Sequence, residues 1–435
     1  MKEQNNIPTS KVKRAAKLIS TGAKLGGNYV KYYAKSAVGD KEEAKEQLDK
    51  DNAEDIYNSL SELKGSALKV AQIMSMDKNT LPKAMIDKFS LAQYSAPPLS
   101  YPLVVKTFRQ MFSKAPTELF DTFSKNAINA ASIGQVHLAE KEGKKLAVKV
   151  QYPGVAESVH SDLTMVKPIA MKMLGLKEKE VKRYFEEVES KLLEETDYVL
   201  ELKQSIEISE ASRDLVGVHF PSYYPELSSK KVLTMDFLEG MHLDKFLKTN
   251  PSQEIRNKAG QHLWDMYDFH INNLLKIHAD PHPGNFLFDE EGNIGVIDFG
   301  CVKEVPKDFY RNYFQLINPE YFNDKEKLTE LFYYLEFLYE NDTKEAKEFF
   351  YNTFKESLHL ITLPFTVDEF DFSDETYFEK VYAKGEELSK SKDVRKNGAA
   401  RGSRHTLYIN RAYIGLFSFL NQLQAKVNTR CSFEF

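Results

Sequence analysis

The spacing of apolar residues predicts a chain that begins with helices, continues through a region of strands and ends mainly in helices. Apolar residues recur near helical spacing over residues 51–75, after a charged, helix-prone stretch from Asp40 to Asp51. A further helical pattern covers residues 102–112, and Pro97 and Pro98 break the chain just before it. The first part of the chain is therefore predicted to be a helical extension.

Short apolar runs bounded by turn residues predict strands in the middle of the chain. The run "LAVKV" at 146–150 places a lysine between apolar residues, and "KKVLTMDFLEG" at 230–240 is typical of one buried strand ending in a turn. The segment "NFLFDEEGNIGVIDFG" at 285–300 predicts two strands joined by the turn "EEGN". A long helical stretch is expected from about Lys179 to Arg213. The pattern as a whole indicates a small lobe with strands, a connector near 236–238 and a larger helical lobe.

The composition is that of a large globular protein. The 435 residues are 42% hydrophobic and 28% charged, which is enough to bury a sizeable core in two lobes or domains. The formal net charge of −5 gives no reason to expect nucleic acid as a partner. Two cysteines, Cys301 and Cys431, are too few for a disulfide framework and fit a reducing compartment. No run approaches the about 20 apolar residues that a membrane-spanning helix needs, so a cytosolic location is the default expectation.

Residues 10–36 are basic, unlike the chain as a whole, which has a negative net charge. They contain lysines and an arginine but no acidic residue, with apolar side chains between them. That pattern suits a helix lying on an anionic membrane surface. It also suits a solvated helix docked on its own domain, because Gly22, Gly26 and Gly27 weaken a continuous amphipathic helix. Both interpretations stay open from the sequence.

The strongest chemical signal is "HADPHPGNFLF" at 278–288, followed by "VIDFG" at 296–300. Magnesium-dependent phosphoryl transfer needs a carboxylate near the attacking oxygen and hard oxygen ligands for the metal. Asp280, Asn285 and Asp298 supply that set, in the order and spacing of the kinase catalytic loop and Asp-Phe-Gly motif. We therefore predict Asp280 as the catalytic carboxylate, and Asn285 and Asp298 as ligands of Mg²⁺.

Lys149 in "AVKV" is then predicted to hold the α- and β-phosphates of ATP or ADP. Such a lysine needs a helix glutamate to fix its side chain. The helical segment "LLEETDYVLELK" offers Asp197 and Glu201, which lie four residues apart and share a helix face. By spacing alone, either acid can reach Lys149.

Several weaker candidates are predicted to be structural. His278 and His282 are expected to stabilise the catalytic loop by hydrogen bonds, and Cys301 to be a small buried residue. Trp264 and the aromatic residues of "LFYYLEFLYE" fall at helical spacing and are most simply core. The acidic and aromatic region from Asn318 to Glu387 predicts a helical insertion, and the polar stretch that follows it, "SKSKDVRKNGAARGSRH", predicts a mobile loop.

This combination resembles the UbiB family of atypical kinases, also called the ABC1 or ADCK family, which belongs to the protein-kinase-like superfamily. The resemblance starts near Lys11 and covers nearly the whole chain. It rests on "KGSALKVAQ", "INAASIGQVHLAE", "LAVKVQYPGV", "EETDYVLE", "HADPHPGNFLF", "DFG" and, near the end, "YINRAYIGLFSFLNQLQAK". It implies an α+β, two-lobed protein-kinase-like fold with a helical extension at 1–98, a strand-bearing lobe at 99–235 and a largely helical lobe at 236–435.

The resemblance also assigns residues to family motifs. It implies that Glu201 pairs with Lys149 in the catalytic set, and that Glu195 and Asp197 form the family's ExD motif. Lys69 and Gln72 match its KxGQ motif, although Ala71 replaces the motif glycine. On an ideal helix Glu195 points nearly opposite Asp197. Both can face one site only if the helix is irregular there.

The loop before the lysine strand is alanine-rich where other kinases are glycine-rich, and Asn129 stands where its first alanine is common in the family. Added Cβ atoms hinder close wrapping around a γ-phosphate. We therefore expect nucleotide to bind, with ADP favoured relative to ATP. The predicted nucleotide-binding residues are Ala130, Ala131, Ser132, Lys149, Asp236, Phe237 and Leu238.

The leading function is therefore an ATP-binding, ATP-hydrolysing atypical kinase at a membrane surface, and the family implies support of ubiquinone or related isoprenoid-lipid metabolism. After Asp-Phe-Gly the chain passes almost directly into a helix, without the long segment that shapes a peptide groove, so phosphorylation of other proteins is not expected. The expected partners are nucleotide, an anionic membrane and lipid or quinone precursors. The expected location is cytoplasmic, peripheral on the inner face of the membrane.

Two other functions stay open. Aminoglycoside and choline kinases have a similar "H-x-D-x-H-x-x-N" loop, so a small-molecule kinase is an alternative, although those folds lack a KxGQ extension. A nucleotide-gated pseudokinase scaffold that binds lipid or quinone intermediates would use the same residues to hold nucleotide without turnover. A change of Asp280 that preserves binding separates enzyme from scaffold, because only the enzyme loses its function.

Overall fold

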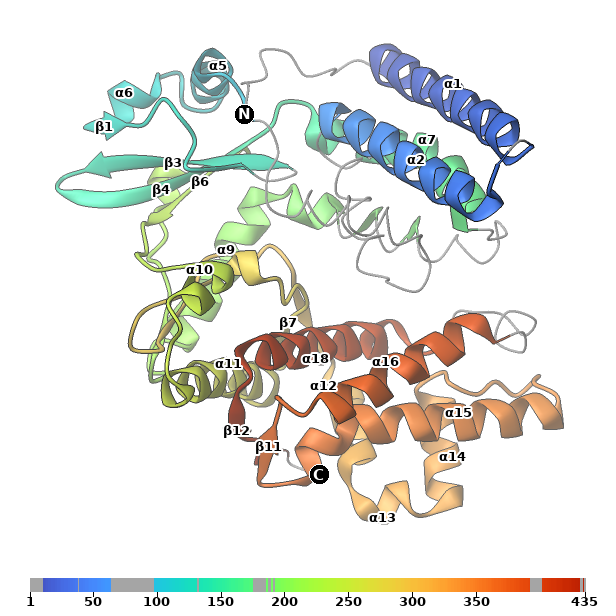
Figure 1. Cartoon of the computed structure of the whole chain (residues 1–435). Helices are drawn as coiled ribbons and strands as arrows, with labels where there is room; N and C mark the ends of the chain where they lie inside the picture. Colours follow the sequence, from blue (N-terminus) through green and yellow to red (C-terminus); the bar gives the residue numbers. More distant parts are fainter. Residues whose placement is uncertain are drawn as a thin grey trace. The chain divides into compact units, whose positions relative to one another are not determined.

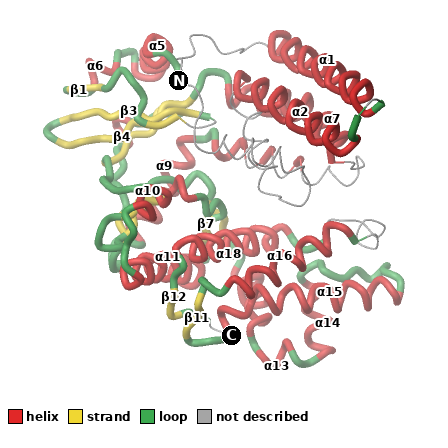
Figure 2. Tube along the Cα trace, in the orientation of Figure 1, coloured by secondary structure: helices red, strands yellow, loops and turns green. Residues whose placement is uncertain are grey.

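The chain divides into two compact units, which are described separately. The computed structural model describes residues 11–37, 39–63, 98–130, 133–174, 185–186, 189–190, 192–391, 401–430 and 433. The first unit comprises Met1–Lys203 and Tyr223–Phe237, and the second comprises Gln204–Ser222 and Leu238–Phe435. Helices and strands are both present, so the fold is α+β as predicted (Figures 1 and 2).

An antiparallel sheet forms the centre of the first unit. Its strand order is β1-β3-β4-β6, with β2 paired to β3. The strands are β1 (Thr122–Phe123), β2 (Asn129–Ala130), β3 (Gly134–Lys141), β4 (Lys144–Gln151) and β6 (Val232–Asp236). The apolar runs that predicted the lysine strand and the buried strand near 235 are β4 and β6, so both predictions are confirmed.

The two faces of β4 have different neighbours. Its side chains alternate, as in any strand. Leu146, Val148 and Val150 share an apolar cluster with α5 (Tyr101–Phe112). Ala147 belongs to a second cluster that contains Tyr198. Lys149 and Gln151 lie on the same face of β4 as Ala147. A charged and a polar side chain are therefore placed in a largely buried environment.

The remaining described helices of the first unit include two in the extension, which was predicted to be helical. They are α1 (Lys11–Ser36), α2 (Lys41–Leu63), α6 (Pro116–Leu119) and α7 (Val155–Leu174). Helices α1 and α2 pack together, and the amide of Asn28 donates to Asn52 at 3.2 Å. Helix α1 runs through its three glycines, and a Cβ at any of them would meet nothing within 4 Å. Among the described helices, none is both long and apolar enough to cross a membrane.

The helical stretch predicted from about Lys179 to Arg213 is not one helix, and this is a correction. A helical turn at 192–195 ends at Thr196, and α9 (Tyr198–Ala211) begins anew. Asp197 stands at the N-cap of α9, where its Oδ1 accepts the backbone N–H groups of Val199 at 3.1 Å and Leu200 at 3.0 Å. A capping aspartate satisfies the first orphan N–H groups of a helix, which fixes where α9 starts.

The second unit is mainly helical, with short strands beside the predicted catalytic loop. Its small sheets pair β5 (Val218–His219) with β9 (Ile294–Val296), β9 with β8 (Phe286–Phe288), and β7 (Lys276–His278) with β10 (Val302–Glu304). The predicted hairpin is therefore confirmed as β8 and β9. The helices are α10 (Leu243–Lys248), α11 (Gln253–Asn273), α12 (Lys307–Phe314), α13 (Pro319–Phe322), α14 (Lys325–Tyr334), α15 (Lys344–Thr362), α16 (Glu375–Lys390) and α18 (Arg404–Leu423).

The acidic and aromatic region after residue 318 is helical, and it shares the main core of the second unit. Trp264 on α11 lies in one cluster with Phe350, Phe372 and Phe417, and its ring stacks on Phe417 at 6.3 Å. The region also holds the short strand β11 (Glu369–Asp371), which the sequence did not predict and which pairs with β12 (Lys426–Asn428). The region is therefore built into the core.

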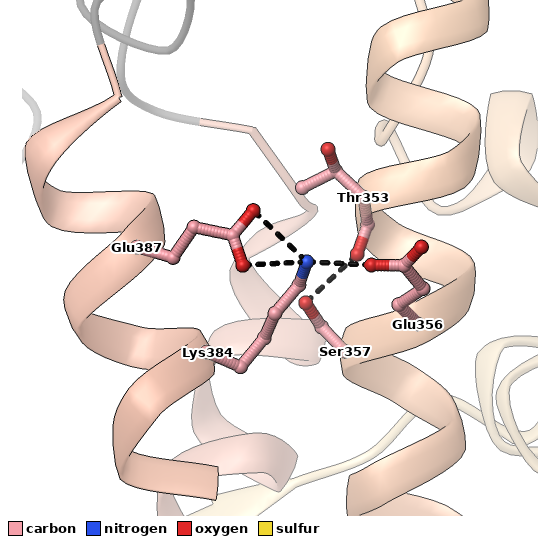
Figure 3. A network of polar contacts seen from close by, with 5 residues as sticks. All are labelled: Thr353, Glu356, Ser357, Lys384 and Glu387. Carbon is pink, nitrogen blue, oxygen red and sulfur yellow. Dashed lines mark hydrogen bonds and ion pairs between the residues drawn. The ribbon is translucent and has the colours of Figure 1, made fainter. Parts of the chain in front are cut away.

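A polar network joins α15 to α16 on the surface of this unit (Figure 3). The ammonium of Lys384 donates to Glu356 at 2.6 Å and to Glu387 at 3.0 Å, while the hydroxyl of Ser357 donates to the carbonyl of Thr353 at 2.8 Å. Burial alone would lower the pKa of Lys384, but the hydrogen bonds that its ammonium donates to Glu356 and Glu387 outweigh burial and raise the pKa. The network links the two neighbouring helices through the ammonium of Lys384, which stays protonated.

Arg401 corrects the prediction of a mobile polar loop at 389–405. Residues 392–400 lie outside the described part of the chain, but Arg401 is buried and its guanidinium forms two hydrogen bonds with Asp342, at 2.7 and 2.6 Å. It also lies over the ring of Phe350, 3.6 Å from the centroid. An arginine in a polar, basic run resembles a solvated residue, and nothing local in the sequence signals its distant partner.

Candidate functional site

The first unit carries the predicted lysine and glutamate side by side. Lys149 on β4 and Glu201 in the first turn of α9 form an ion pair, with Nζ and Oε1 2.7 Å apart. The Glu201 side chain is 2% exposed and that of Lys149 is 14% exposed. The ammonium also lies over the ring of Tyr198, 5.1 Å from its centroid. Of the two acids that spacing allowed, the structure pairs Glu201 with Lys149, while the carboxylate of Asp197 caps α9.

The helix break between Glu195 and Tyr198 is held from the sheet. Gln151, on the same face of β4 as Lys149, donates its amide N–H to the carbonyl of Thr196 at 2.8 Å. Glu195 and Asp197 can serve one site only if the helix is irregular between them, and the break supplies that irregularity. Glu195 is buried, at 7% exposure. Sequence reasoning missed Gln151, although its spacing of two residues from Lys149 placed it on the same face.

The predicted loop residues are only partly described. Ala130 lies on β2 and pairs with Gln135 of β3, while Ala131 and Ser132 lie outside the described residues. Gly134, at the start of β3, is a glycine for a steric reason that the sequence did not reveal. A Cβ there would lie 2.7 Å from the hydroxyl oxygen of Tyr198 and 2.9 Å from the carbonyl oxygen of Val150. The KxGQ-like residues, Lys69 and Gln72, also lie outside the described residues.

The connector after β6 is held by two contacts within the first unit. The hydroxyl of Tyr224 donates to Asp236 at 2.6 Å, and the N–H of Phe237 donates to the carbonyl of Lys145 at 3.0 Å. Burial and the bond to Asp236 raise the pKa of Tyr224 to about 12, so its proton stays in place. Leu238 begins the next part of the second unit.

The second unit brings Asp280, Asn285 and Asp298 into one hydrogen-bonded loop. A 3₁₀ turn at Pro283–Asn285 follows β7, and the side-chain amide of Asn285 donates to the carbonyl of Asp280 at 3.0 Å. Ile297, just before Asp298, donates its N–H to the carbonyl of Asn285 at 3.0 Å. The carboxylate of Asp298 accepts the N–H of Gly300 at 2.7 Å. The tight turn and the β8–β9 hairpin therefore fix all three residues relative to one another.

Both histidines of the loop form local hydrogen bonds, as predicted. The Nε2 atom of His278 lies 2.8 Å from the carbonyl oxygen of Asp298, which ties the start of the loop to the Asp-Phe-Gly motif. The Nδ1 atom of His282 accepts the N–H of Gly284 at 3.0 Å. Cys301 is buried beside Ala279, as expected for a small packed residue.

Sequence reasoning missed one charged neighbour of Asp280. Arg411 on α18 places Nη2 3.6 Å from Oδ1 of Asp280, and the two side chains are 27% and 17% exposed. The residues are separated by more than a hundred positions, so no local pattern connects them. The second unit therefore carries a cation that the predicted set did not include.

The chemistry of these donors fits a magnesium ion. Asp298 offers carboxylate oxygens, and Asn285 offers an amide oxygen because its amide nitrogen is turned to the carbonyl of Asp280. Hard oxygen ligands of this kind suit Mg²⁺, which keeps several waters and takes its other ligands from substrate phosphates. Among the described residues, no three histidine, cysteine or acidic side chains form a cluster that could hold a metal ion. Such a cluster would suit a closed protein cage more than a site shared with phosphates.

The lysine–glutamate pair and the loop of Asp280 fit the pattern of an atypical kinase, and comparison with known proteins assigns the chain to that class. The family model of the ABC1 atypical kinase-like domain matches residues 91–332, and the chain belongs to that family. The family falls in the kinase-like phosphotransferase class, whose members use nucleotide and Mg²⁺ in general.

Particular relatives come from eukaryotes. The chain is 30% identical over 312 residues to the probable serine/threonine-protein kinase abkA of Dictyostelium discoideum, covering 68% of this chain and 55% of that protein. It is 28% identical over 388 residues to the mitochondrial atypical kinase COQ8 of Saccharomyces cerevisiae, covering 87% and 76%. The chain thus spans just over half the length of the Dictyostelium relative.

A solved structure supports the fold. The structure of Rv3197 from Mycobacterium tuberculosis in complex with erythromycin is similar to this chain with a TM-score of 0.60 and 24% identity. The match covers 90% of this chain and 97% of that one. The two-lobed, protein-kinase-like fold predicted from the motifs is therefore confirmed.

Proposed function

We propose that the protein binds ATP or ADP with Mg²⁺ and transfers the γ-phosphoryl group of ATP to water or to a small or lipid-like acceptor. The observation that carries this proposal is that each unit, taken by itself, holds its own part of the residues that phosphoryl transfer needs in an ordered arrangement. The first unit presents a lysine already paired with a buried glutamate. The second presents Asp280, Asn285 and Asp298 in one ordered loop.

Each side chain has a role that its contacts support. Lys149, held by Glu201, would bind the α- and β-phosphates as a point charge. Asp280 would accept the proton of the attacking water or hydroxyl group. Asn285 and Asp298 would hold Mg²⁺, which when bound neutralises charge on the phosphate oxygens. Ala130, Ala131, Ser132 and the connector Asp236–Leu238 are proposed to line the nucleotide.

Proteins are not the proposed acceptor. Only six residues, 301–306, separate Gly300 from the start of α12, and three of them form β10, which pairs with β7. The long segment that shapes a peptide groove in protein kinases is therefore replaced by a short strand. This favours water or a small acceptor over a protein side chain.

A membrane surface is the proposed place of action. Helix α1 exposes Tyr29, Val30 and Tyr33, the last two at 70% and 66% exposure, beside exposed Lys31 and Lys35. Aromatic and apolar side chains next to lysines suit the interface of an anionic membrane. A role in ubiquinone or related isoprenoid-lipid metabolism, with lipid or quinone precursors as ligands, is what the UbiB resemblance adds to this proposal.

The test is phosphate release from Mg·ATP by the purified full chain, with and without anionic liposomes. Asp298→Asn serves as the control, because it removes the negative charge of a proposed metal ligand at almost constant volume. Release that rises with liposomes and disappears in the variant is the expected result. Nucleotide binding without phosphate release under any condition would overturn the ATPase proposal and favour a nucleotide-gated scaffold. In that case an Asp280→Asn variant should bind nucleotide and keep its function.

A further inference from the structure

One face of α18 runs along the catalytic loop, residues 278–288. Near the start of the helix, Tyr408 packs against Ala279 and Cys301 in a small buried cluster. Three turns later, the ring of Phe419 meets Phe286 edge-on, with centroids 5.4 Å apart. The helix therefore contacts the loop near both of the loop's ends.

Between these points, Gly415 of α18 lies against Pro281 of the loop. A Cβ on Gly415 would lie 2.0 Å from Cγ and 2.9 Å from Cβ of Pro281. Since real Cβ atoms do not approach other atoms so closely, any larger residue at 415 must push the helix and the loop apart. Pro281 follows Asp280 directly, so this contact sets the distance of Asp280 from the helix axis.

The charged contact lies one helical turn before Gly415. Arg411 and Gly415 are four residues apart and so share a face of α18. That face brings the guanidinium of Arg411 within 3.6 Å of the Asp280 carboxylate, while the Asp280 carbonyl is held by Asn285. The main chain and the side chain of Asp280 are thus held by different partners, and α18 supplies a positive charge beside the side chain.

We propose that α18 acts as a template for the catalytic loop and that Arg411 is a positioning residue for the carboxylate of Asp280. This inference rests on the proposed phosphoryl transfer, in which Asp280 accepts a proton. Helix α18 lies outside the residues 91–332 that match the family domain, so part of the site's support comes from beyond that domain. The reach of a proton-accepting carboxylate is sensitive to displacements of about 1 Å, which can cost about 100-fold in rate.

The first experiment compares phosphate release by Arg411→Gln, Arg411→Lys and the matched control Arg430→Gln. Arg430 is also in the second unit and pairs with Asp368 at 3.1 Å, but both side chains are more than 70% exposed. We expect Arg411→Gln to lower kcat by about 10- to 100-fold with KM for ATP within about twofold. Arg411→Lys should recover part of kcat, and Arg430→Gln should match the parent protein. Equal kcat values in Arg411→Gln and the parent would overturn the role of Arg411.

The second experiment reads the loop without relying on turnover. Hydrogen exchange of the backbone amides at 279–285 is measured in the full chain for the parent, Gly415→Ala and Arg430→Gln. We expect faster exchange in Gly415→Ala alone, with unchanged exchange in α14 of the second unit showing that the unit carrying the substitution is folded. Unchanged loop exchange would overturn the template. A parent protein that releases no phosphate defeats the proposed function, whereas this measurement still decides whether α18 orders the loop.

Discussion

Each unit contains a buried ion pair, and the two pairs are built differently. In the first unit, Lys149 meets Glu201 through a contact of 2.7 Å, and the lysine side chain is 14% exposed. In the second, Arg401 forms two parallel hydrogen bonds with Asp342 and donates another to the carbonyl of Phe337 at 3.0 Å. Its side chain is 3% exposed and is covered by an aromatic ring.

The difference shows why charge and burial alone do not identify a functional residue. The planar fork of arginine matches a carboxylate, and both terminal nitrogens of Arg401 donate to Asp342. Lysine carries a compact charge on a flexible stem, which suits a phosphate that comes and goes. We therefore interpret the pair in the first unit as part of the site, and the pair in the second as support for the core.

The largest effect is expected when the site pair is broken. Lys149→Met should reduce phosphate release by about 100-fold or more, because it removes the proposed phosphate contact. It should also lower the free energy of unfolding of the first unit by about 3 kcal/mol, since Glu201 stays buried without its cation. Hydrogen exchange of β3 and β4 measures the second effect. Lys144→Met, an exposed lysine on the same strand, is the control, and an equal loss there would contradict the assignment.

Breaking the support pair should destabilise without impairing chemistry. Arg401→Met should lower the free energy of unfolding of the second unit by about 3 kcal/mol, because Asp342 becomes a buried, uncompensated charge. The hydrogen bond from Arg401 lowers the pKa of Asp342, so this contribution is present at neutral pH and is lost only as pH falls below about 3.8. Urea unfolding measures the loss. The folded fraction should keep the parent's kcat, and a fall in kcat would join Arg401 to the site.

Acid should weaken the two units through different histidines. Burial lowers the pKa of His270 to about 3, so in the folded second unit it stays neutral while an unfolded histidine binds a proton near pH 6.5. The unfolded state then gains protons first, and the free energy of unfolding should fall by about 2 kcal/mol from pH 6.5 to 5.

A pair of variants separates the two contributions. His270→Gln should flatten the pH dependence of hydrogen exchange in the second unit. A smaller pH dependence should remain, because burial also lowers the pKa of His262. His137→Gln should act on the first unit, where burial lowers the pKa of His137. If either variant changed the acid response of both units equally, the units would not unfold separately.

The smallest effect is expected at the surface network of Figure 3. Lys384→Met removes the cation between Glu356 and Glu387, which are 64% and 66% exposed. Exposed ion pairs contribute little, so the second unit should lose less than about 1 kcal/mol. Thermal unfolding at low and high salt measures it. A loss of unfolding free energy as large as that of Arg401→Met would mean that the exposure of an ion pair does not determine its contribution to stability.

The parts of the fold that the sequence predicted are those that depend on local patterns. The strands around Lys149 and the hairpin after Asn285 follow from apolar alternation and a four-residue turn, and the loop of Asp280 from fixed spacing. The break at Thr196 was not predicted, although threonine and aspartate are weak helix formers and aspartate favours an N-cap. It depends on Gln151, which is distant in sequence and donates from the sheet.

Long-range partners explain the other differences. Arg401 was predicted in a mobile loop because its neighbours in sequence are polar, yet its partner is Asp342, 59 positions away. Arg411 sits in a helix whose pattern predicts packing and gives no sign of Asp280. In both cases the charge is explained by a tertiary contact that composition and periodicity do not encode.

The short link after Gly300 has a consequence for how this protein is controlled. Kinases that are switched on by phosphorylation reorder the segment after Asp-Phe-Gly once a phosphate is added. Here that segment is already the strand β10, and Val302 pairs with His278 at the start of the catalytic loop. A switch of that type would have to break the pairing of β10 with β7, which would disturb the loop that it activates. Activation by a phosphate added to this segment is therefore not expected of this protein.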